Sequence, residues 1–280
     1  MITIGEIKKN LISILNDHNI PDSQFEAISI IAYSLGLDHK EVITENDINI
    51  SDEGELRVFE ILKKRLEGNP LAYLINEKTF FNKIFFIDQN VLIPRQETEE
   101  VIEYFFSLNQ NNSMKNKNIL DIGTGSGIIS IICKKKYPLA NLFSIDKSNG
   151  AINVAKKNAE IKNVSIDFIC TDIQNCKISK IDYVISNPPY IKQKILKDLQ
   201  KEVLKEPLIA LNGGLDGLKV IKNIFEWEKN INNNNALQII IEIDEQIKYE
   251  AKELAKNFYP HKKIKIINDI ANKPRILSIN

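Results

Sequence analysis

The first 75 residues carry apolar side chains at the spacing of amphipathic helices. Thr3 and Glu6 have the spacing of a capping box, and Ser51 and Gly68 stand where a later helix would begin and end. Apolar residues at intervals of three and four form three stripes: Ile4, Ile7, Leu11 and Ile14; Phe25, Ile28, Ala32 and Leu35; Leu56, Phe59, Leu62 and Leu66. This pattern predicts a small all-α bundle over residues 1–75.

Residues 76–93 have a different pattern. Two apolar triplets, 79–81 and 84–86, flank Asn82 and Lys83, which predicts a β-hairpin or a pair of short strands. We interpret this segment as a connector between two domains.

From residue 94 onward, strands and helices are predicted to alternate. After a helix near residues 101–108, the expected strands are 118–121, 141–146, 165–170, 181–186, 236–242, 262–267 and 275–279, and the expected helices are 128–136, 149–160, 216–230 and 245–257. Such alternation is typical of a mostly parallel sheet with helices on both faces. The fold class is therefore α/β, and residues 94–280 form its domain.

Charge is distributed unevenly between these regions. The 280 residues include 37 basic and 37 acidic side chains, so the formal net charge is zero, which argues against a protein that coats nucleic acid or an anionic membrane. Residues 1–75 have a net charge of −6, and residues 76–280 have a net charge of +6. We expect two modules with different roles.

The three cysteines predict neither a disulfide framework nor a metal site. Cys133, Cys170 and Cys176 lack CxxC spacing, and no histidine stands at ligand distance in the sequence. Cys133 and Cys170 lie in apolar runs and are expected to be buried. Because we find neither a membrane-spanning run nor a signal-peptide pattern, we expect a cytoplasmic protein with no metal and no membrane partner.

A glycine-rich turn, Gly123-Thr124-Gly125-Ser126-Gly127, follows the first strand of the α/β region. The dinucleotide fingerprint G-x-G-x-x-G fails here, because Ile128 or Ser130 occupies the third glycine position in the two possible frames. The G-x-G-x-G form is instead seen in S-adenosylmethionine-dependent methyltransferases.

Two aspartates end the next two strands. Asp146 lies about 20 residues beyond the turn, where a carboxylate can accept hydrogen bonds from both hydroxyls of an adenosine ribose. The alternative for Asp146 is a helix-capping role. Asp172 ends the third strand and is a candidate neighbour of the adenine, with a turn-forming role as its alternative.

Asn187-Pro188-Pro189-Tyr190 ends the fourth strand, at the sheet edge where ligands bind in this fold class. The Asn187 side-chain oxygen and the Pro188 carbonyl can together accept both protons of a planar –NH₂ group. The nitrogen lone pair then points at an electrophilic methyl, and Tyr190 supplies a flat wall. The motif has no titratable base, and this chemistry needs none.

These motifs, together with Pro94-Arg95-Gln96-Glu97-Thr98-Glu99, resemble the bacterial peptide chain release factor glutamine methyltransferases, the HemK/PrmC family. The resemblance implies methyl transfer from S-adenosylmethionine, with S-adenosylhomocysteine as product, to the glutamine of the Gly-Gly-Gln motif in class 1 release factors, which modulates translation termination. It implies that Gly123 to Gly127, Asp146 and Asn187 bind the cofactor and that Asn187 to Tyr190 hold the glutamine. Three residues depart from the family pattern: Gln96 stands where the family usually has Pro, Asn76 replaces a usual Gly, and Ile173 stands where some members have an aromatic residue against the adenine.

Two alternatives remain open from the sequence. One is the same chemistry on a ribosomal-protein glutamine or on adenine in nucleic acid, and the other is a non-catalytic module that binds release factors. The intact Asn187 to Tyr190 motif argues against the second, since a binding module does not need that geometry. We expect residues 1–75 to recognise the release factor, and we expect no stable nucleic-acid partner.

Overall fold

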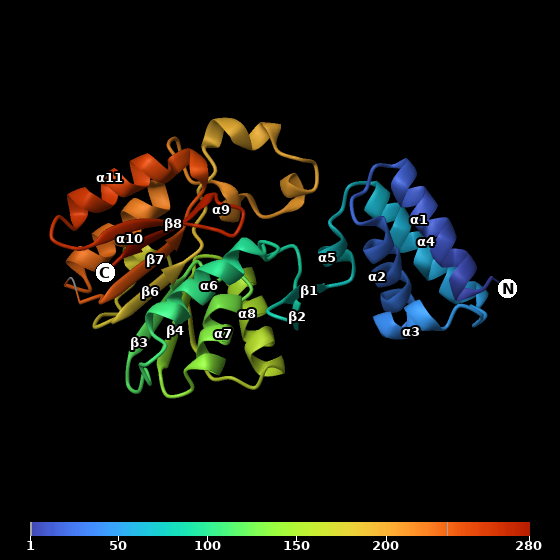
Figure 1. Cartoon of the computed structure of the whole chain (residues 1–280), viewed down its shortest axis with the longest axis horizontal. Helices are drawn as coiled ribbons and strands as arrows, with labels where there is room; N and C mark the ends of the chain where they lie inside the picture. The colour runs from blue at the N-terminus through green and yellow to red at the C-terminus, as the bar shows by residue number, and fades with distance from the viewer. Residues whose placement is uncertain (1, 234) are drawn as a thin grey trace. The chain divides into compact units, whose positions relative to one another are not determined.

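The computed structural model describes residues 2–233 and 235–280, which form two compact units (Figure 1). The helical unit comprises Met1–Glu77 and Lys201–Lys205, and the sheet unit comprises Lys78–Gln200 and Glu206–Asn280. The sequence did not predict that residues 201–205 would join the helical unit.

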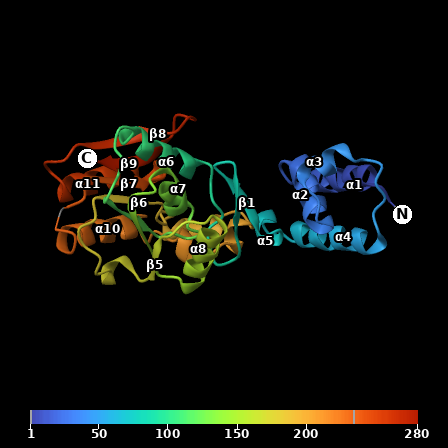
Figure 2. The ribbon, with the colours of Figure 1, turned by 90° about the horizontal axis from the view of Figure 1, so that it is seen from below.

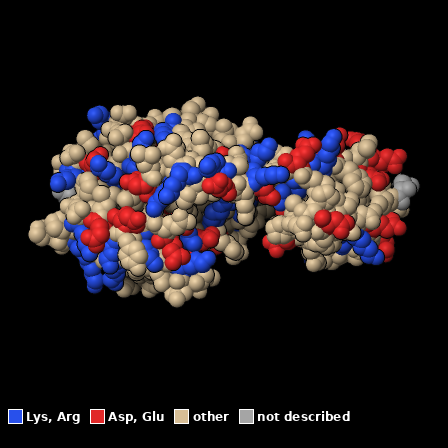
Figure 3. All heavy atoms as spheres, turned by 90° about the horizontal axis from the view of Figure 1, so that it is seen from above, with Lys and Arg blue, Asp and Glu red and all other residues tan. Residues whose placement is uncertain are grey.

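The helical unit is a small all-α bundle. It contains α1 (Ile4–Asp17), α2 (Ser23–Leu35), α3 (His39–Thr44), α4 (Asp52–Leu66) and α5 (Leu71–Leu74), and η3 (Val203–Lys205) belongs to its later segment. The capping box of Thr3 and Glu6 is present, and Ser51 caps α4 through the Gly54 N–H. Charged side chains are distributed over both units, with an acidic excess on the helical one (Figure 3).

The buried faces of these helices differ in part from the predicted stripes. Leu15 rather than Ile14 lies in the core of α1, and Phe25 and Leu56 are 57% and 65% exposed. Phe25 and Leu56 both lie in the first turn or two of their helices, where Ala27 and Val58 take the buried positions instead. Spacing alone does not decide which side of a mixed helix faces the core.

The core of the helical unit also contains a buried cation. Arg65 on α4 is 2% exposed, and its guanidinium binds the Glu26 carboxylate through Nε (2.6 Å) and Nη2 (2.9 Å). Its Nη1 donates to Glu202 Oε1 at 2.8 Å. Burial raises the pKa of Glu26, and the bidentate hydrogen bonds from Arg65 oppose that rise. Arg65 therefore holds the returning segment 201–205 on the bundle.

The sheet unit has seven strands in the order β5-β4-β3-β6-β7-β9-β8, and β9 runs antiparallel to both of its neighbours. The strands are β3 (Asn118–Ile122), β4 (Asn141–Asp146), β5 (Asp167–Cys170), β6 (Tyr183–Ser186), β7 (Gln238–Glu242), β8 (Ile264–Asn268) and β9 (Pro274–Ile279). All seven match the predicted positions within three residues.

Helices cover both faces of this sheet (Figures 1 and 2). Leu120 and Val184 pack into the core that contains α10 and α11. Because successive side chains of a strand point to opposite faces, Tyr183 faces the other side, where it contacts Phe105 of α6. The helices and short 3-10 turns are α6 (Glu97–Leu108), α7 (Ile128–Lys136), α8 (Asn149–Ile161), η1 (Ile173–Asn175), η2 (Gln193–Asp198), α9 (Leu208–Leu211), α10 (Lys219–Asn230), η4 (Glu245–Ile247) and α11 (Lys248–Phe258). The predicted mostly parallel α/β sheet is confirmed.

The connector forms a two-stranded sheet of β1 (Glu77–Phe80) and β2 (Lys83–Phe86), as predicted. Its turn is Phe81-Asn82, both at positive φ as in a type I′ turn, and not Asn82-Lys83. Just before β1, Asn76 has φ +54°, a left-handed conformation that Gly adopts freely and Asn tolerates. The backbone thus explains why Asn is acceptable where the family usually has Gly.

Two further findings concern expectations from the sequence. Cys133 is buried as predicted, but Cys170 is exposed, because β5 is an edge strand with little cover. Within the described residues, no helix is both long and apolar enough to cross a membrane.

Replacing Arg65 by Met tests the buried ion pair. Arg65→Met leaves the Glu26 carboxylate buried without its cation, so the free energy of unfolding of the helical unit should fall by about 3–5 kcal/mol. Arg57→Met on the same helix is the control, because Arg57 and Glu53 are 53% and 83% exposed, and it should cost roughly 0.5 kcal/mol or less. Urea denaturation followed by circular dichroism measures both, and equal losses would contradict the role assigned to Arg65.

Candidate active site

The site begins where two neighbouring parallel strands end side by side. β3 and β6 are adjacent, with Ile122 opposite Ser186, and the Ser186 hydroxyl donates to the Ile122 carbonyl at 2.7 Å. The chain continues from β3 to β4 on one side of this pair and from β6 to β7 on the other. Loops that diverge at such a switch point leave a crevice at the carboxyl ends of the strands.

A pocket of about 550 Å³ occupies this edge of the sheet, a size suited to a small-molecule ligand. Most of the predicted site residues line it, namely Gly123, Thr124, Gly125, Ser126, Asp146, Asp172, Asn187 and Pro189. Gly127, Pro188 and Tyr190 are not on its wall. Gly127 instead begins α7, Pro188 is buried, and Tyr190 points toward Glu242.

The glycine turn needs its glycines for backbone reasons. Gly123, Gly125 and Gly127 have φ values of +72°, +53° and +81°, which L side chains rarely adopt. At Gly127, a Cβ would also lie 3.0 Å from Ala155 Cβ and 3.1 Å from Ala155 Cα on α8. The third glycine therefore sets how closely α8 approaches the start of α7.

Asp146 is tied to this turn through its carboxylate. Oδ2 accepts from the Gly125 N–H at 3.0 Å, and Oδ1 accepts from the Ser148 N–H at 2.9 Å. Each oxygen keeps lone-pair capacity for a ligand hydroxyl. Burial raises the pKa of Asp146, and these backbone N–H groups oppose that rise. The cap of α8 is Ser148, so the helix-capping alternative for Asp146 does not hold.

Asp172 has the turn-forming role that was its predicted alternative, and its place beside an adenine stays a prediction. Its Oδ1 accepts from the Gln174 N–H at 3.1 Å and so caps η1, and the same residue lines the pocket. Ile173 beside it is 5% exposed and also lines the pocket, which gives an aliphatic wall in place of an aromatic one.

Two buried polar side chains that the sequence did not indicate support the turn. Asp121 accepts from the Thr124 hydroxyl at 2.6 Å, and burial raises the pKa of this carboxyl to about 6. Asn158 on α8 donates to the carbonyls of Ser126 and Phe86, both at 2.9 Å, and accepts from the Phe86 N–H at 2.7 Å. It joins the end of β2 to the glycine turn.

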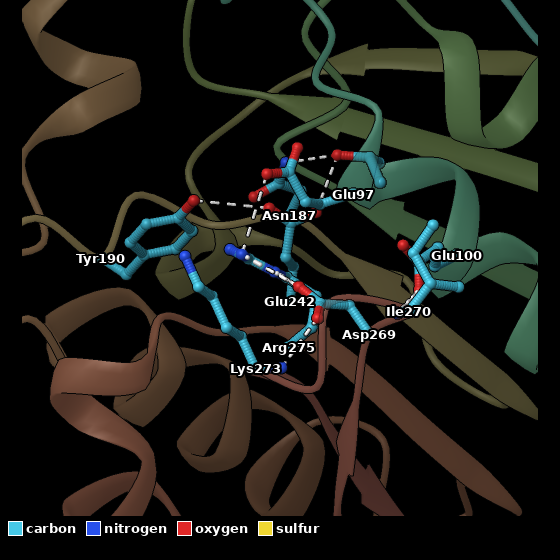
Figure 4. A network of polar contacts seen from close by, with 10 residues as sticks. Glu97, Glu100, Asn187, Tyr190, Glu242, Asp269, Ile270, Lys273 and Arg275 are labelled. Carbon is cyan, nitrogen blue, oxygen red and sulfur yellow. Dashed lines mark hydrogen bonds and ion pairs between the residues drawn. The ribbon is translucent and has the colours of Figure 1, made fainter.

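A second buried network holds the Asn187 side chain (Figure 4). Asn187 Nδ2 donates to Thr98 Oγ1 at 3.0 Å, and Thr98 Oγ1 donates to Glu242 Oε2 at 2.7 Å. The Tyr190 hydroxyl lies 3.4 Å from Glu242 Oε1. Burial raises the pKa of Glu242 to about 7, and burial together with Glu242 raises the pKa of Tyr190. Thr98 and Glu242 were not predicted as site residues, although Thr98 belongs to the 94–99 motif.

The residues that follow Tyr190 are covered by a second glycine-rich segment. The Ile191 N–H donates to the Leu211 carbonyl at 3.1 Å, and the Gly213 N–H donates to the Ile191 carbonyl at 2.9 Å. A Cβ on Gly213 would lie 2.7 Å from Tyr190 Cα, so only glycine permits this close backbone approach. Residues 187–190 are therefore fixed by backbone packing as well as by side chains.

The chain matches two protein-family models. The model described as Methyltransferase small domain matches residues 105–251, and the model described as PrmC N-terminal domain matches residues 6–75.

Several curated relatives named release factor glutamine methyltransferase are similar over most of the chain. The protein from Flavobacterium psychrophilum is 35% identical over 86% of this chain and 85% of its own length. The relative from Thermodesulfovibrio yellowstonii is 34% identical over 90% of each chain, and that from Dictyoglomus turgidum is 32% identical over 95% of this chain and 94% of its own.

Two solved structures share the fold. The hMettl16 catalytic domain in complex with MAT2A 3′UTR hairpin 6 matches with a TM-score of 0.56 at 14% identity, covering 85% of each chain. The T. thermophilus 16S rRNA N2 G1207 methyltransferase in complex with AdoMet and guanosine matches with a TM-score of 0.52 at 10% identity, covering 73% of this chain and 49% of that one. At these identities the likeness concerns the fold alone.

The glycine turn predicts different costs for two alanine substitutions. Gly127→Ala adds a clash with Ala155 to the strain of a positive φ, so the free energy of unfolding should fall by roughly 2–5 kcal/mol. Gly123→Ala is the matched control, because a Cβ there meets nothing within 4 Å, and it should cost only about 1–2 kcal/mol. Urea denaturation without ligand compares them, and a larger loss at Gly123 would refute this packing argument.

Proposed function

The chain belongs to the release factor glutamine methyltransferases, and on this premise we propose that it transfers a methyl group from S-adenosylmethionine to a glutamine side-chain nitrogen of a release factor. The observation that carries the proposal is the position of Asn187. Asn187 lines the same pocket as the glycine turn and Asp146. An acceptor for a substrate –NH₂ group and a nucleoside-binding turn thus share one crevice.

The residues of this pocket fit S-adenosylmethionine. Residues 123–126 of the glycine turn line the pocket, two of them glycines without a side chain, and the Asp146 carboxylate retains lone pairs for the two ribose hydroxyls. Asp172 and Ile173 border the space for the adenine. When bound, the cofactor supplies an electrophilic methyl group on a sulfonium. The proposed reaction uses no metal ion.

Asn187 and Pro188 bind the substrate amide. The Asn187 Oδ1 and the Pro188 carbonyl accept the two amide protons, which returns electron density to a nitrogen whose lone pair is otherwise delocalised. Tyr190 provides a flat surface against the amide plane. These preorganised acceptors and the fixed position of the nitrogen lower the barrier without a general base. The alkylated nitrogen is acidic enough to lose its proton to water.

The protein substrate needs a larger contact surface than one glutamine. We assign this role to the helical unit, whose residues 1–75 carry a net charge of −6 and whose surface includes the exposed Phe25 and Leu56. By resemblance to the family, the substrate is a class 1 release factor, and the glutamine is that of its Gly-Gly-Gln motif.

Mass spectrometry of purified release factors tests the function directly. Incubation with the enzyme and methyl-labelled cofactor should add one methyl group to the Gly-Gly-Gln glutamine. Asn187→Ala should lower kcat by about 10²–10³, because it removes an acceptor that strengthens in the transition state. Its affinity for S-adenosylhomocysteine should change much less, because the turn and Asp146 remain. Labelling of a ribosomal protein or of nucleic acid, with none on release factors, would overturn the proposal.

Deleting residues 1–75 tests the role of the helical unit. Affinity for S-adenosylhomocysteine should change little, since the pocket is lined by residues of the sheet unit. The value of kcat/KM for the intact release factor should fall at least about tenfold, whereas a short peptide containing Gly-Gly-Gln should lose little. Glu202 is 39% exposed, so loss of its partner Arg65 does not leave a buried charge. Equal losses with protein and peptide would show that the bundle has only a structural role.

A further inference from the structure

The hydrogen bonds around Asn187, which Figure 4 draws as dashed lines, run from the Asn187 amide to Thr98 and from Thr98 to Glu242. Glu242 is 1% exposed, and when its carboxylate is ionised it can only accept hydrogen bonds. The Thr98 hydroxyl, also 1% exposed, has a single hydrogen, which it donates to Glu242 Oε2 at 2.7 Å. Toward Asn187, therefore, the Thr98 oxygen can act only as an acceptor.

This polarity decides which end of the Asn187 amide faces the pocket. The two orientations of an asparagine amide have nearly the same shape but exchange an acceptor for a donor. Because Thr98 accepts, the Asn187 –NH₂ group must face it, as it does at 3.0 Å. The carbonyl oxygen then points away from Thr98. In the opposite orientation, the asparagine –NH₂ would meet the substrate –NH₂, donor against donor.

We propose that Glu242 and Thr98 are positioning residues that hold the Asn187 amide with its oxygen toward the substrate nitrogen. The inference rests on the proposed function, because the orientation matters only if the substrate presents an –NH₂ group. Thr98 itself lines the pocket and Glu242 does not, and we assign neither of them a contact with the reacting atoms. Glu242 and Thr98 act through Asn187. The Tyr190 hydroxyl contacts the other carboxylate oxygen of Glu242 at 3.4 Å.

The protonation state of Glu242 should control this polarity. Besides Thr98, the groups that face it are Glu97 from α6, Tyr190, and Arg275 from β9. A protonated Glu242 gains a donor, so Thr98 is no longer forced to accept from Asn187. Because burial raises the pKa of Glu242 to about 7, the wild-type kcat should fall as the pH drops from about 8 to about 6.

Thr98 variants first test the hydrogen-bond relay, which runs from the Asn187 amide through the Thr98 hydroxyl to Glu242. Thr98→Val keeps the shape of the side chain and removes the hydroxyl, so kcat should fall about tenfold to a hundredfold, and the acid limb of the pH profile should disappear. Thr98→Ser restores the hydroxyl and should stay within about threefold of wild type. Tyr104→Phe is the control, because it removes another hydroxyl contact between α6 and the sheet, to Ser278 at 3.3 Å, and should leave kcat unchanged. Affinity for S-adenosylhomocysteine should be similar in all four proteins.

Reversing the direction of the hydrogen bonds between residues 187, 98 and 242 gives a sharper test. In Asn187→Asp, two carboxylates compete for the one Thr98 proton, so kcat should fall about a hundredfold. Adding Glu242→Gln supplies an –NH₂ donor to the Thr98 oxygen and leaves a single carboxylate, the one at position 187, to receive the Thr98 proton. The double variant should therefore exceed Asn187→Asp by about tenfold, although Glu242→Gln alone lowers kcat.

The outcomes separate this inference from the proposed function. Wild-type enzyme that methylates no release factor would contradict the function. Active wild type with an equally active Thr98→Val, a Thr98→Ser as impaired as Thr98→Val, or a double variant that merely multiplies the single effects would each overturn the relay. The orientation is also measurable without activity. In ¹⁵N NMR, one Asn187 side-chain amide proton should show slow solvent exchange that Thr98→Val accelerates at least about tenfold, and equal exchange rates would overturn the relay as well.

Discussion

The pairing of β3 with β6 is the interaction on which the site depends. Their parallel register places Ile122 opposite Ser186, so the glycine turn and Asn187 leave the sheet from neighbouring positions. The Ser186 hydroxyl adds a side-chain bond to the last carbonyl of β3 at 2.7 Å. Since the chain winds away from this pair in opposite directions, the crevice between the two loops is a property of the topology, and the loop residues supply only its chemistry.

Buried polar side chains then convert these loops into fixed surfaces. Asp121 and Asn158 hold the glycine turn, and Thr98 and Glu242 hold Asn187. A buried amide or carboxylate is costly unless it is hydrogen-bonded, so each of these groups restricts the arrangement of its partners, although Asp121 Oδ1 has no hydrogen-bond partner among the described residues. The cost of burying them is what makes the loop geometry specific. The sheet determines the residues at which the two loops begin, and the hydrogen bonds of these four side chains fix the path of the loop backbone.

Much of this arrangement could be predicted from the sequence because it is local. The periodicity located every strand of the large sheet, and short motifs pointed to the glycine turn, Asp146 and Asn187, which line one pocket. Thr98 and Glu242 were missed because their partners lie 89 and 144 residues away, and no short motif encodes such a distance. The exposure of Cys170 was likewise missed, because it depends on the place of β5 at the sheet edge.

The return of residues 201–205 to the helical unit makes that unit discontinuous in sequence. The backbone passes between the two units after Glu77, after Gln200 and after Lys205, so a single cut after Glu77 separates residues 1–77 from the sheet unit but leaves residues 201–205 covalently attached to it. The loop that follows Tyr190 is held at two points. Arg65 binds Glu202 within the loop, and Glu206 at its far end accepts a hydrogen bond from the Ile93 N–H at 2.9 Å. Anchoring a long loop at an interior point reduces its chain entropy, so the segment that follows residues 187–190 starts from an ordered state.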